Sequence, residues 1–449
     1  MFITGMHFVW SSPSLPKLYA NESQIHISIE EGSWIASTEL LTNIPGSLIG
    51  AILADYLGRK KSILITTLPY LSSWLLIAYG KDIKTLLTAK FLVGIADGIT
   101  YTILPMYVGE IAEDDIRGKL GNCMTVMFDS GSLFLYSVAP WISIQSMAQI
   151  GSIFPIILCI LIIFMPETPY YLLMKEKIPE AKESLQLLRQ YSSNIDTEFN
   201  EMRKIVEFQT HQTSNWSDLY MNPGYFKGIL IIMGVKTLQQ MSGIYAIMVY
   251  SEIIFEEADG IFSGAISSII FGTFLLISGI CGLLIIDKIG RRPLLVFSFL
   301  GCFLALITQT IYFYFQYYNL CDLSMASWVP ISAMLVYIIS YGIGLGPIPM
   351  TYIGEMFPTN IKAKALCFLD IYFGLIEFIV VKNYQIMANY FGSYIPFAIF
   401  SMSCLIGIPF VLYCIPETKG CSLDYIQNIL GNNNISNEKN TKHVEITKL

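Results

Sequence analysis

The sequence is poor in charged residues. Only 14% of its 449 residues are Asp, Glu, Lys or Arg, whereas 54% are hydrophobic and the mean hydropathy is +0.56. Soluble globular domains carry about 25% charged residues. So little charge excludes an ordinary soluble domain and indicates a protein that crosses a membrane many times.

Several chemical signatures are also missing. The nine cysteines form no C-x-x-C pair and show no Cys/His metal spacing, so they are expected to act as small hydrophobic side chains. No G-x-x-x-x-G-K-[ST] run is present, which argues against an ATP site. We also find no nucleophile–base constellation. We therefore expect a protein that is not an enzyme, without catalytic residues, metal or cofactor, and without a nucleic-acid partner.

Long apolar runs make up most of the chain. A helix needs about 20 apolar residues to cross the hydrocarbon core of a membrane. The clear runs lie at roughly 34–54, 62–79, 86–108, 120–139, 150–165, 226–254, 263–286, 294–314, 328–350, 363–381 and 394–415. A further run, Met1 to Trp10, is followed by Ser11-Ser12-Pro13 and lacks the basic segment of a secretory signal. We interpret it as a short first membrane helix that lacks part of its cytoplasmic end.

Basic residues are distributed unevenly around these runs. If both termini are cytoplasmic, the cytoplasmic segments hold twenty-one of the 27 Lys and Arg, the outer loops hold four, and two lie within spans. The positive-inside rule predicts this orientation, and we expect a multi-pass protein of the plasma membrane. Asn21-Glu22-Ser23 is a sequon in an outer loop, so Asn21 is the predicted glycosylation site.

Three motifs occur twice, in the same order, at offsets of 232, 245 and 250 positions. The pairs are Asp55-Tyr56-Leu57-Gly58-Arg59-Lys60 with Asp287-Lys288-Ile289-Gly290-Arg291-Arg292, Tyr107-Val108-Gly109-Glu110-Ile111 with Tyr352-Ile353-Gly354-Glu355-Met356, and Pro166-Glu167-Thr168 with Pro416-Glu417-Thr418. Such offsets indicate a duplicated half rather than a short repeat. We expect two six-helix bundles at 1–165 and 225–415, a polar cytoplasmic loop with short helices at 166–224, and a largely disordered cytoplasmic tail at 416–449.

The repeated motifs collect acids and bases at the cytoplasmic ends of the helices. Gly58 permits a sharp turn, and Asp55 is placed to meet the positive N-terminal end of a neighbouring helix. Ion pairs at the rim of two halves can form in one arrangement and break in another, so we predict a gating network; a positive-inside anchor with a turn is the alternative. The predicted network contains Asp55, Arg59, Lys60, Glu110, Arg117, Glu167, Asp287, Arg291, Arg292, Glu355, Lys362 and Glu417.

Taken together, the motifs resemble those of the sugar porters of the major facilitator superfamily, over nearly the whole chain. They include Pro105-x-Tyr107-x-x-Glu110, Gln239-Gln240-x-Ser242-Gly243, Gly346-Pro347-Ile348-Pro349, Glu355-x-Phe357-Pro358 and Pro416-Glu417-Thr418-Lys419-Gly420. The C-terminal motif and Thr125, eight residues after Arg117, look most like insect trehalose and hexose transporters. The resemblance implies an all-α protein of twelve transmembrane helices in two bundles that rock about a central sugar site.

The function that the resemblance implies is facilitated uniport of trehalose or a hexose, with a sugar and the lipid bilayer as partners. The sequence does not reveal the oligomeric state, and we expect a monomer. Gln239 and Gln240 are costly amides within a span unless they meet a polar ligand, and amides suit carbohydrate hydroxyls. An interhelical hydrogen bond is the alternative. Gly346, Pro347 and Pro349 are expected to break their helix at a gate hinge, with a packing kink as the alternative.

The implied substrate-binding positions depart from the family pattern. They are Gln239, Gln240, Tyr245, Thr125, Met350, Phe373 and Gly374. Tyr245 stands in place of an Asn, Met350 in place of a Trp, and Phe373-Gly374 in place of an Asn-Trp pair. Each change removes an amide or a stacking surface, so transport is better supported than the identity of the sugar.

Acids within the spans leave other functions open. Glu39, Asp97, Asp129 and Glu377 lie in apolar segments, where a charge is expensive and often functional. A proton-coupled symporter could use Asp129 or Glu377. The family's proton symporters, however, carry an acid in the first helix, and this chain has none there. A non-transporting sensor or inactive paralogue is a third possibility. Lys236 is expected to extend its side chain toward the cytoplasm.

Overall fold

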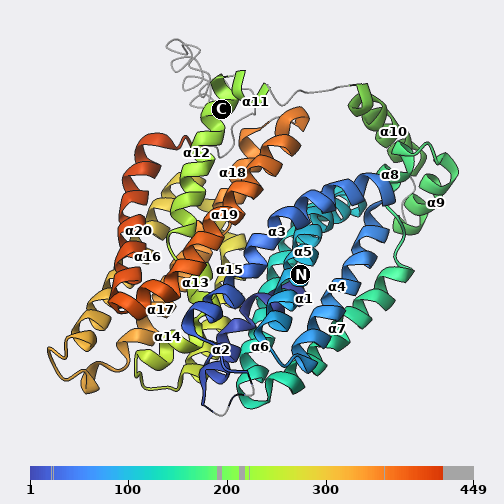
Figure 1. Ribbon diagram of the computed structural model, residues 1–449. Helices are drawn as coiled ribbons and strands as arrows, with labels where there is room; N and C mark the ends of the chain where they lie inside the picture. Colours follow the sequence, from blue (N-terminus) through green and yellow to red (C-terminus); the bar gives the residue numbers. More distant parts are fainter. Residues whose placement is uncertain are drawn as a thin grey trace, which may run out of the picture.

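The computed structural model describes residues 1–417 except Glu22, Gln24, 190–194, 212–217, Asn222 and Pro358, so the predicted tail from Thr418 onward lies outside it. The described residues form helices and no strand, in two halves that lie side by side (Figure 1). Eight of these helices are long and apolar enough to cross a membrane. The remaining spans are interrupted or more polar. The fold is the expected all-α membrane protein with a short first helix.

The amino-terminal half carries the first six spans. Its elements are α1 (Phe2–Val9), α2 (Ser11–Tyr19), α3 (Ile29–Leu57), α4 (Arg59–Tyr79), α5 (Ile83–Ile111), α6 (Asp114–Val138), the 3-10 turn Ala139–Trp141 and α7 (Ile144–Phe164).

The carboxyl-terminal half repeats this plan with more interruptions. Its elements are α12 (Pro223–Gln240), α13 (Ile244–Val249), α14 (Ser251–Glu257), α15 (Gly264–Ile289), α16 (Arg291–Tyr317), the 3-10 turn Ser324–Ala326, α17 (Val329–Ser340), the π-helix Tyr341–Leu345, α18 (Ile348–Met356), α19 (Thr359–Phe391) and α20 (Tyr394–Cys414).

The first span consists of two short helices. The short first helix predicted over Met1 to Trp10 is confirmed as α1 (Phe2–Val9). Trp10, which follows it, has helical φ −54° and ψ −34°, and α2 continues to Tyr19. Pro13 lies in the first turn of α2, where its missing N–H removes little that the helix needs.

Glycines bring α3 and α5 into close contact. A Cβ on Gly98 would lie 2.2 Å from the Asn43 carbonyl oxygen, and one on Gly46 would lie 2.6 Å from that of Ile95. Only glycine fits at such distances, because the obstacle is backbone. The two helices thereby hold the charged side chains on their facing sides close together.

The segment between the halves forms four helices, α8 (Pro169–Met174), α9 (Ile178–Leu188), α10 (Ile195–His211) and α11 (Asp218–Met221). The first three share a small apolar core of their own, formed by Tyr171, Leu172, Leu173, Ala181, Leu185, Phe199, Met202 and Val206. Arg189 donates from Nη1 to the carbonyl of Ile111, 2.9 Å away, and so ties this subdomain to α5. The end of the bundle beside α8–α10 is called the charged end below, and the opposite end the far end.

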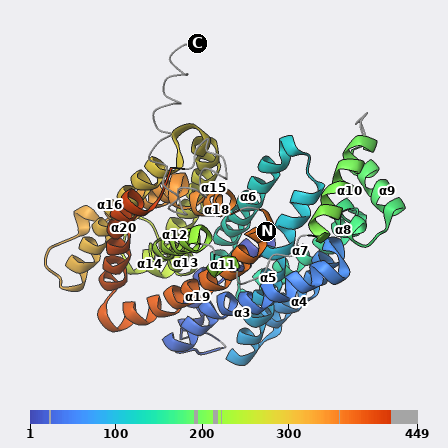
Figure 2. The same ribbon diagram turned by 90° about the horizontal axis from the view of Figure 1, so that it is seen from above.

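The halves meet along two helix pairs, α3 with α19 and α6 with α15, as the view from above shows (Figure 2). At the far end, Ser12 Oγ lies 2.8 Å from Ser251 Oγ and accepts from the Glu252 N–H at 3.1 Å. Tyr136 donates to the carbonyl of Met248 at 2.5 Å, and Lys382 Nζ to Ser33 Oγ at 2.7 Å. These hydrogen bonds join the two halves toward the far end.

Candidate functional site

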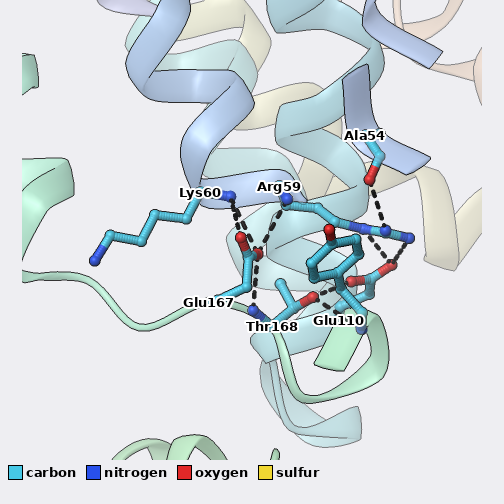
Figure 3. A network of polar contacts seen from close by, with 7 residues as sticks. Ala54, Arg59, Lys60, Glu110, Glu167 and Thr168 are labelled. Carbon is cyan, nitrogen blue, oxygen red and sulfur yellow. Dashed lines mark hydrogen bonds and ion pairs between the residues drawn. The ribbon is translucent and has the colours of Figure 1, made fainter. Parts of the chain in front are cut away.

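At the charged end, a carboxylate from the end of the amino-terminal half caps a helix (Figure 3). Glu167 Oε1 accepts the backbone N–H groups of Arg59, Lys60 and Thr168 at 3.0, 3.1 and 3.0 Å. The first two belong to the first turn of α4, where free N–H groups and the helix dipole favour an anion. Gly58, at φ +90°, makes room, since a Cβ there would lie 2.4 Å from Glu167 Oε2.

The Arg59 guanidinium binds a second carboxylate. Its Nε and Nη2 donate to Glu110 Oε1 at 3.1 and 2.8 Å, and Nη1 donates to the Ala54 carbonyl at 3.1 Å. Thr168 Oγ1 donates to the other oxygen of Glu110 at 2.5 Å. Burial, and then the Glu167 carboxylate, raise the pKa of the neighbouring Tyr171, whose neutral hydroxyl donates to the Tyr56 carbonyl. The side chains therefore lock the ends of α3, α4 and α5 together.

The carboxyl-terminal half repeats the helix cap. Glu417 accepts the N–H groups of Arg291 and Arg292 at 3.1 and 3.0 Å, after Gly290 at φ +109°. Arg292 Nη2 donates to the Leu412 carbonyl, as Lys60 Nζ donates to that of Ile163. The duplicated motif thus has the same structural role in both halves. A glycine turn precedes a helix, and the carboxylate of a glutamate far along the chain accepts the first N–H groups of that helix.

This arrangement corrects two expectations about the predicted network. Asp55 is exposed and is not the acid that meets the helix end, because Glu167 occupies that position. The Lys60 ammonium binds a carbonyl rather than an acid. The described pairs each lie within one half, and the side chains of Arg117, Asp287, Glu355 and Lys362 lie outside the described residues. Gating by the network stays a prediction.

Replacing Glu167 with alanine is expected to destabilise the protein by about 1–3 kcal/mol, because three backbone donors lose their half-buried charged acceptor. The check is the melting temperature of purified protein in detergent. Asp55→Ala is the matched control, since that acid is exposed, and it should leave the melting temperature unchanged. Equal shifts in the two variants would contradict the capping role.

Near the middle of the bundle, the Gln239 amide binds the interrupted tenth span. Nε2 lies 3.0 Å from the Tyr341 hydroxyl and donates to the carbonyls of Leu345 at 2.7 Å and Gly346 at 3.2 Å. Gln239 and Gln240 are both buried, and neither Oε1 accepts a hydrogen bond from a described residue. Each amide therefore keeps an unused acceptor.

The break in the tenth span is confirmed. A π-helix at Tyr341–Leu345 ends α17, Gly346 and Pro347 form a turn, and α18 begins at Ile348 with Pro349 in its first turn. A break inside a membrane is tolerated only where the freed carbonyls find donors. Gln239 supplies that donor. Whether the break acts as a hinge stays a prediction.

The other predicted binding positions are less closely grouped. Tyr245 packs edge-on against Phe8, with ring centroids 5.4 Å apart. Gly374 lies on the contact between the halves, where a Cβ would come within 3.0 Å of Ile44. Thr125 on α6 and Met350 on α18 are exposed and make no hydrogen bond to the glutamine pair.

Lys236 does not extend toward the charged end as expected. Its side chain is buried, and its ammonium lies over the Phe373 ring, 4.9 Å from the centroid. An ammonium can replace part of its hydration with the face of an aromatic ring. Phe373 therefore stabilises the ammonium group of Lys236, a charge of the protein itself rather than of a bound ligand.

An ion pair that the sequence did not predict lies within the amino-terminal half. Lys90 Nζ on α5 lies 2.7 Å from Glu39 Oε2 on α3 and donates to the His7 carbonyl at 2.8 Å; both side chains are buried. Further along α5, Asp97 accepts from Tyr70 at 2.5 Å. The signal in the sequence was one base and two acids within apolar spans of the same half.

Comparison with known proteins agrees with this architecture. The family model described as "Sugar (and other) transporter" matches residues 9–430. A facilitated trehalose transporter of Apis mellifera ligustica is 31% identical over 425 residues, covering 94% of this chain and 84% of that protein. One of Drosophila grimshawi is also 31% identical, over 95% of this chain but only 46% of the relative's length.

Solved structures show the same fold. The inward-open form of the E. coli xylose transporter superposes with a TM-score of 0.79 at 19% identity, covering 95% of this chain and 97% of that one. The proton:xylose symporter bound to 6-bromo-6-deoxy-D-glucose gives 0.75 at 20% identity, covering 96% of each. At such identities the likeness establishes the fold alone.

Proposed function

The chain belongs to the family of sugar (and other) transporters, and we propose from that membership that it carries trehalose or a hexose across the plasma membrane by facilitated, alternating access. The observation that carries the proposal is the way the two repeated halves meet. Side chains join them by hydrogen bonds toward the far end, and a span is interrupted beside Gln239 near the middle. Repeated halves around an interrupted helix are what an alternating-access carrier requires.

The charged end is proposed to face the cytoplasm, with both termini on that side. The twenty-one basic residues of the cytoplasmic segments support this orientation, since positive charge is retained inside. Asn21 then lies outside and is exposed, as a glycosylation acceptor must be. We propose that a monomer is sufficient for transport.

Uptake of radiolabelled trehalose and glucose in oocytes, with a pH series and a protonophore, tests the proposal. Saturable flux in both directions that ignores the proton gradient is expected. Flux that collapses with the gradient would instead identify a proton-coupled symporter. Absence of flux for every sugar, with normal surface expression, would identify a sensor or an inactive paralogue.

Replacing Gln240 with alanine is expected to weaken sugar binding without changing the surface level. The amide is buried with an unused acceptor, and one lost hydrogen bond of about 0.5–1.5 kcal/mol corresponds to a KM roughly twofold to tenfold higher. Gln149→Ala is the matched control, because Gln149 is exposed on α7. An unchanged KM for Gln240→Ala would place the sugar elsewhere.

A further inference from the structure

Two ionisable side chains near the middle of the bundle are buried without a hydrogen bond or ion pair to a described residue. Asp129 on α6 and Lys236 on α12 are each 5% exposed. An isolated ionisable group inside a membrane protein is expensive and is retained where it meets a ligand, water or another charge. Lys236 is held over the Phe373 ring, whereas Asp129 has no such support among the described residues.

Asp129 points from one half toward the other. The α6 helix packs on α15 across the contact between the halves, and a Cβ on Gly279 of α15 would lie 3.1 Å from Asp129 Oδ2. A glycine at that position leaves the carboxylate room. The acid therefore lies between the two bodies that must move relative to each other during transport.

Asp129 lies beside the helix break at the candidate sugar site. The stretch of α15 that contains Gly279 packs on the π-helix Tyr341–Leu345, since a Cβ on Gly282 would lie 2.1 Å from the Gly342 carbonyl oxygen. Tyr341 of this π-helix contacts the Gln239 amide. The acid is therefore placed near the predicted binding glutamines.

Lys236 does not serve as the partner of Asp129. Its ammonium lies over the Phe373 ring of its own half. Asp129 is thus left without a basic side chain among the described residues, and the tyrosine ring beside the break can also attract a cation.

We propose that the transported solute is an amino sugar of hexose size, and that its protonated amine binds Asp129 between the two halves. The inference rests on the proposed function and narrows its substrate class. An uncharged sugar would leave Asp129 buried and unpaired, whereas an ammonium group provides both the opposite charge and hydrogen-bond donors. The amides of Gln239 and Gln240 then form hydrogen bonds with the hydroxyl groups of the same solute.

The test compares solutes of similar shape and different charge. In oocytes expressing the full chain, glucosamine is expected to compete with labelled glucose at concentrations at least about tenfold lower than N-acetylglucosamine or glucose, as for a 1.4 kcal/mol preference. Glucuronate, an anion, should compete least. Equal competition by glucosamine and N-acetylglucosamine would overturn the proposal while leaving sugar transport intact.

The variant Asp129→Asn keeps the size of the side chain and removes its charge. The ratio of glucosamine to glucose uptake within one variant is expected to fall about tenfold. Asp322→Asn is the matched control, because Asp322 is exposed outside the spans, and it should keep the ratio. An unchanged ratio in Asp129→Asn would reject the assigned residue.

A binding measurement covers the case in which the variant does not reach the surface. Purified wild-type protein should gain more thermal stability from glucosamine than from N-acetylglucosamine at equal concentration. Equal shifts would overturn the proposal. Absence of both uptake and stabilisation for every sugar would instead reject the proposed function itself.

Discussion

Replacing Lys90 with methionine is expected to destabilise the protein by about 3–5 kcal/mol, a larger loss than Glu167→Ala should cause. The change leaves the Glu39 carboxylate buried without the ammonium that lies 2.7 Å away. It also removes the donor to the His7 carbonyl, which joins α1 to α5. Surface level and the melting temperature in detergent measure the loss.

A double substitution separates the ion pair from the packing of the side chains. Glu39→Gln combined with Lys90→Met removes both charges, and it should recover most of the stability that Lys90→Met loses. Lys84→Met, an exposed position on the same helix, is the control. If Lys90→Met is no more harmful than Lys84→Met, the pair contributes little.

Gly98→Leu is expected to prevent the amino-terminal half from assembling, with a loss of more than about 3 kcal/mol and no detectable protein at the surface. The added side chain would meet backbone atoms of Asn43 and Ser47 at 2.2 and 2.4 Å, and neither can move without displacing α3 from α5. Gly98→Ala should give an intermediate loss.

The control for this substitution is a glycine with open space around it. A Cβ on Gly121 of α6 meets nothing within 4 Å. Gly121→Leu should therefore give near-normal surface levels. Similar losses at the two positions would show that the membrane, rather than the contact between α3 and α5, rejects the larger residue.

The architecture could be predicted from the sequence because its signals are local or repeated. Apolar runs of sufficient length fix the spans, and three duplicated motifs fix the division into halves. The continuation of the first span through α2 was harder to see, since composition does not show that Pro13 falls in the first turn of a helix, where a missing N–H matters little.

The partners of charged residues were harder to predict, because they depend on the folded path of the chain. Asp55 stands next to the glycine turn in sequence, yet Glu167, 108 positions after Arg59, reaches the helix end. Glu39 and Lys90 are 51 positions apart and become neighbours only through the glycine contacts between α3 and α5. Spacing along the chain carries no signal for such pairs.

The Gln239 amide has a consequence for how binding and movement are linked. In this state Nε2 satisfies the carbonyls of Leu345 and Gly346 at the break in the tenth span. A solute that accepts the hydrogen bond from Gln239 Nε2 would weaken the contact between α12 and the break in the tenth span. Conversely, a bend that moves the break away from Gln239 would free Nε2 for the solute. Thermodynamic reciprocity requires both effects to have the same size. A solute bound by Gln239, as proposed above, would therefore compete with the interrupted helix for one side chain.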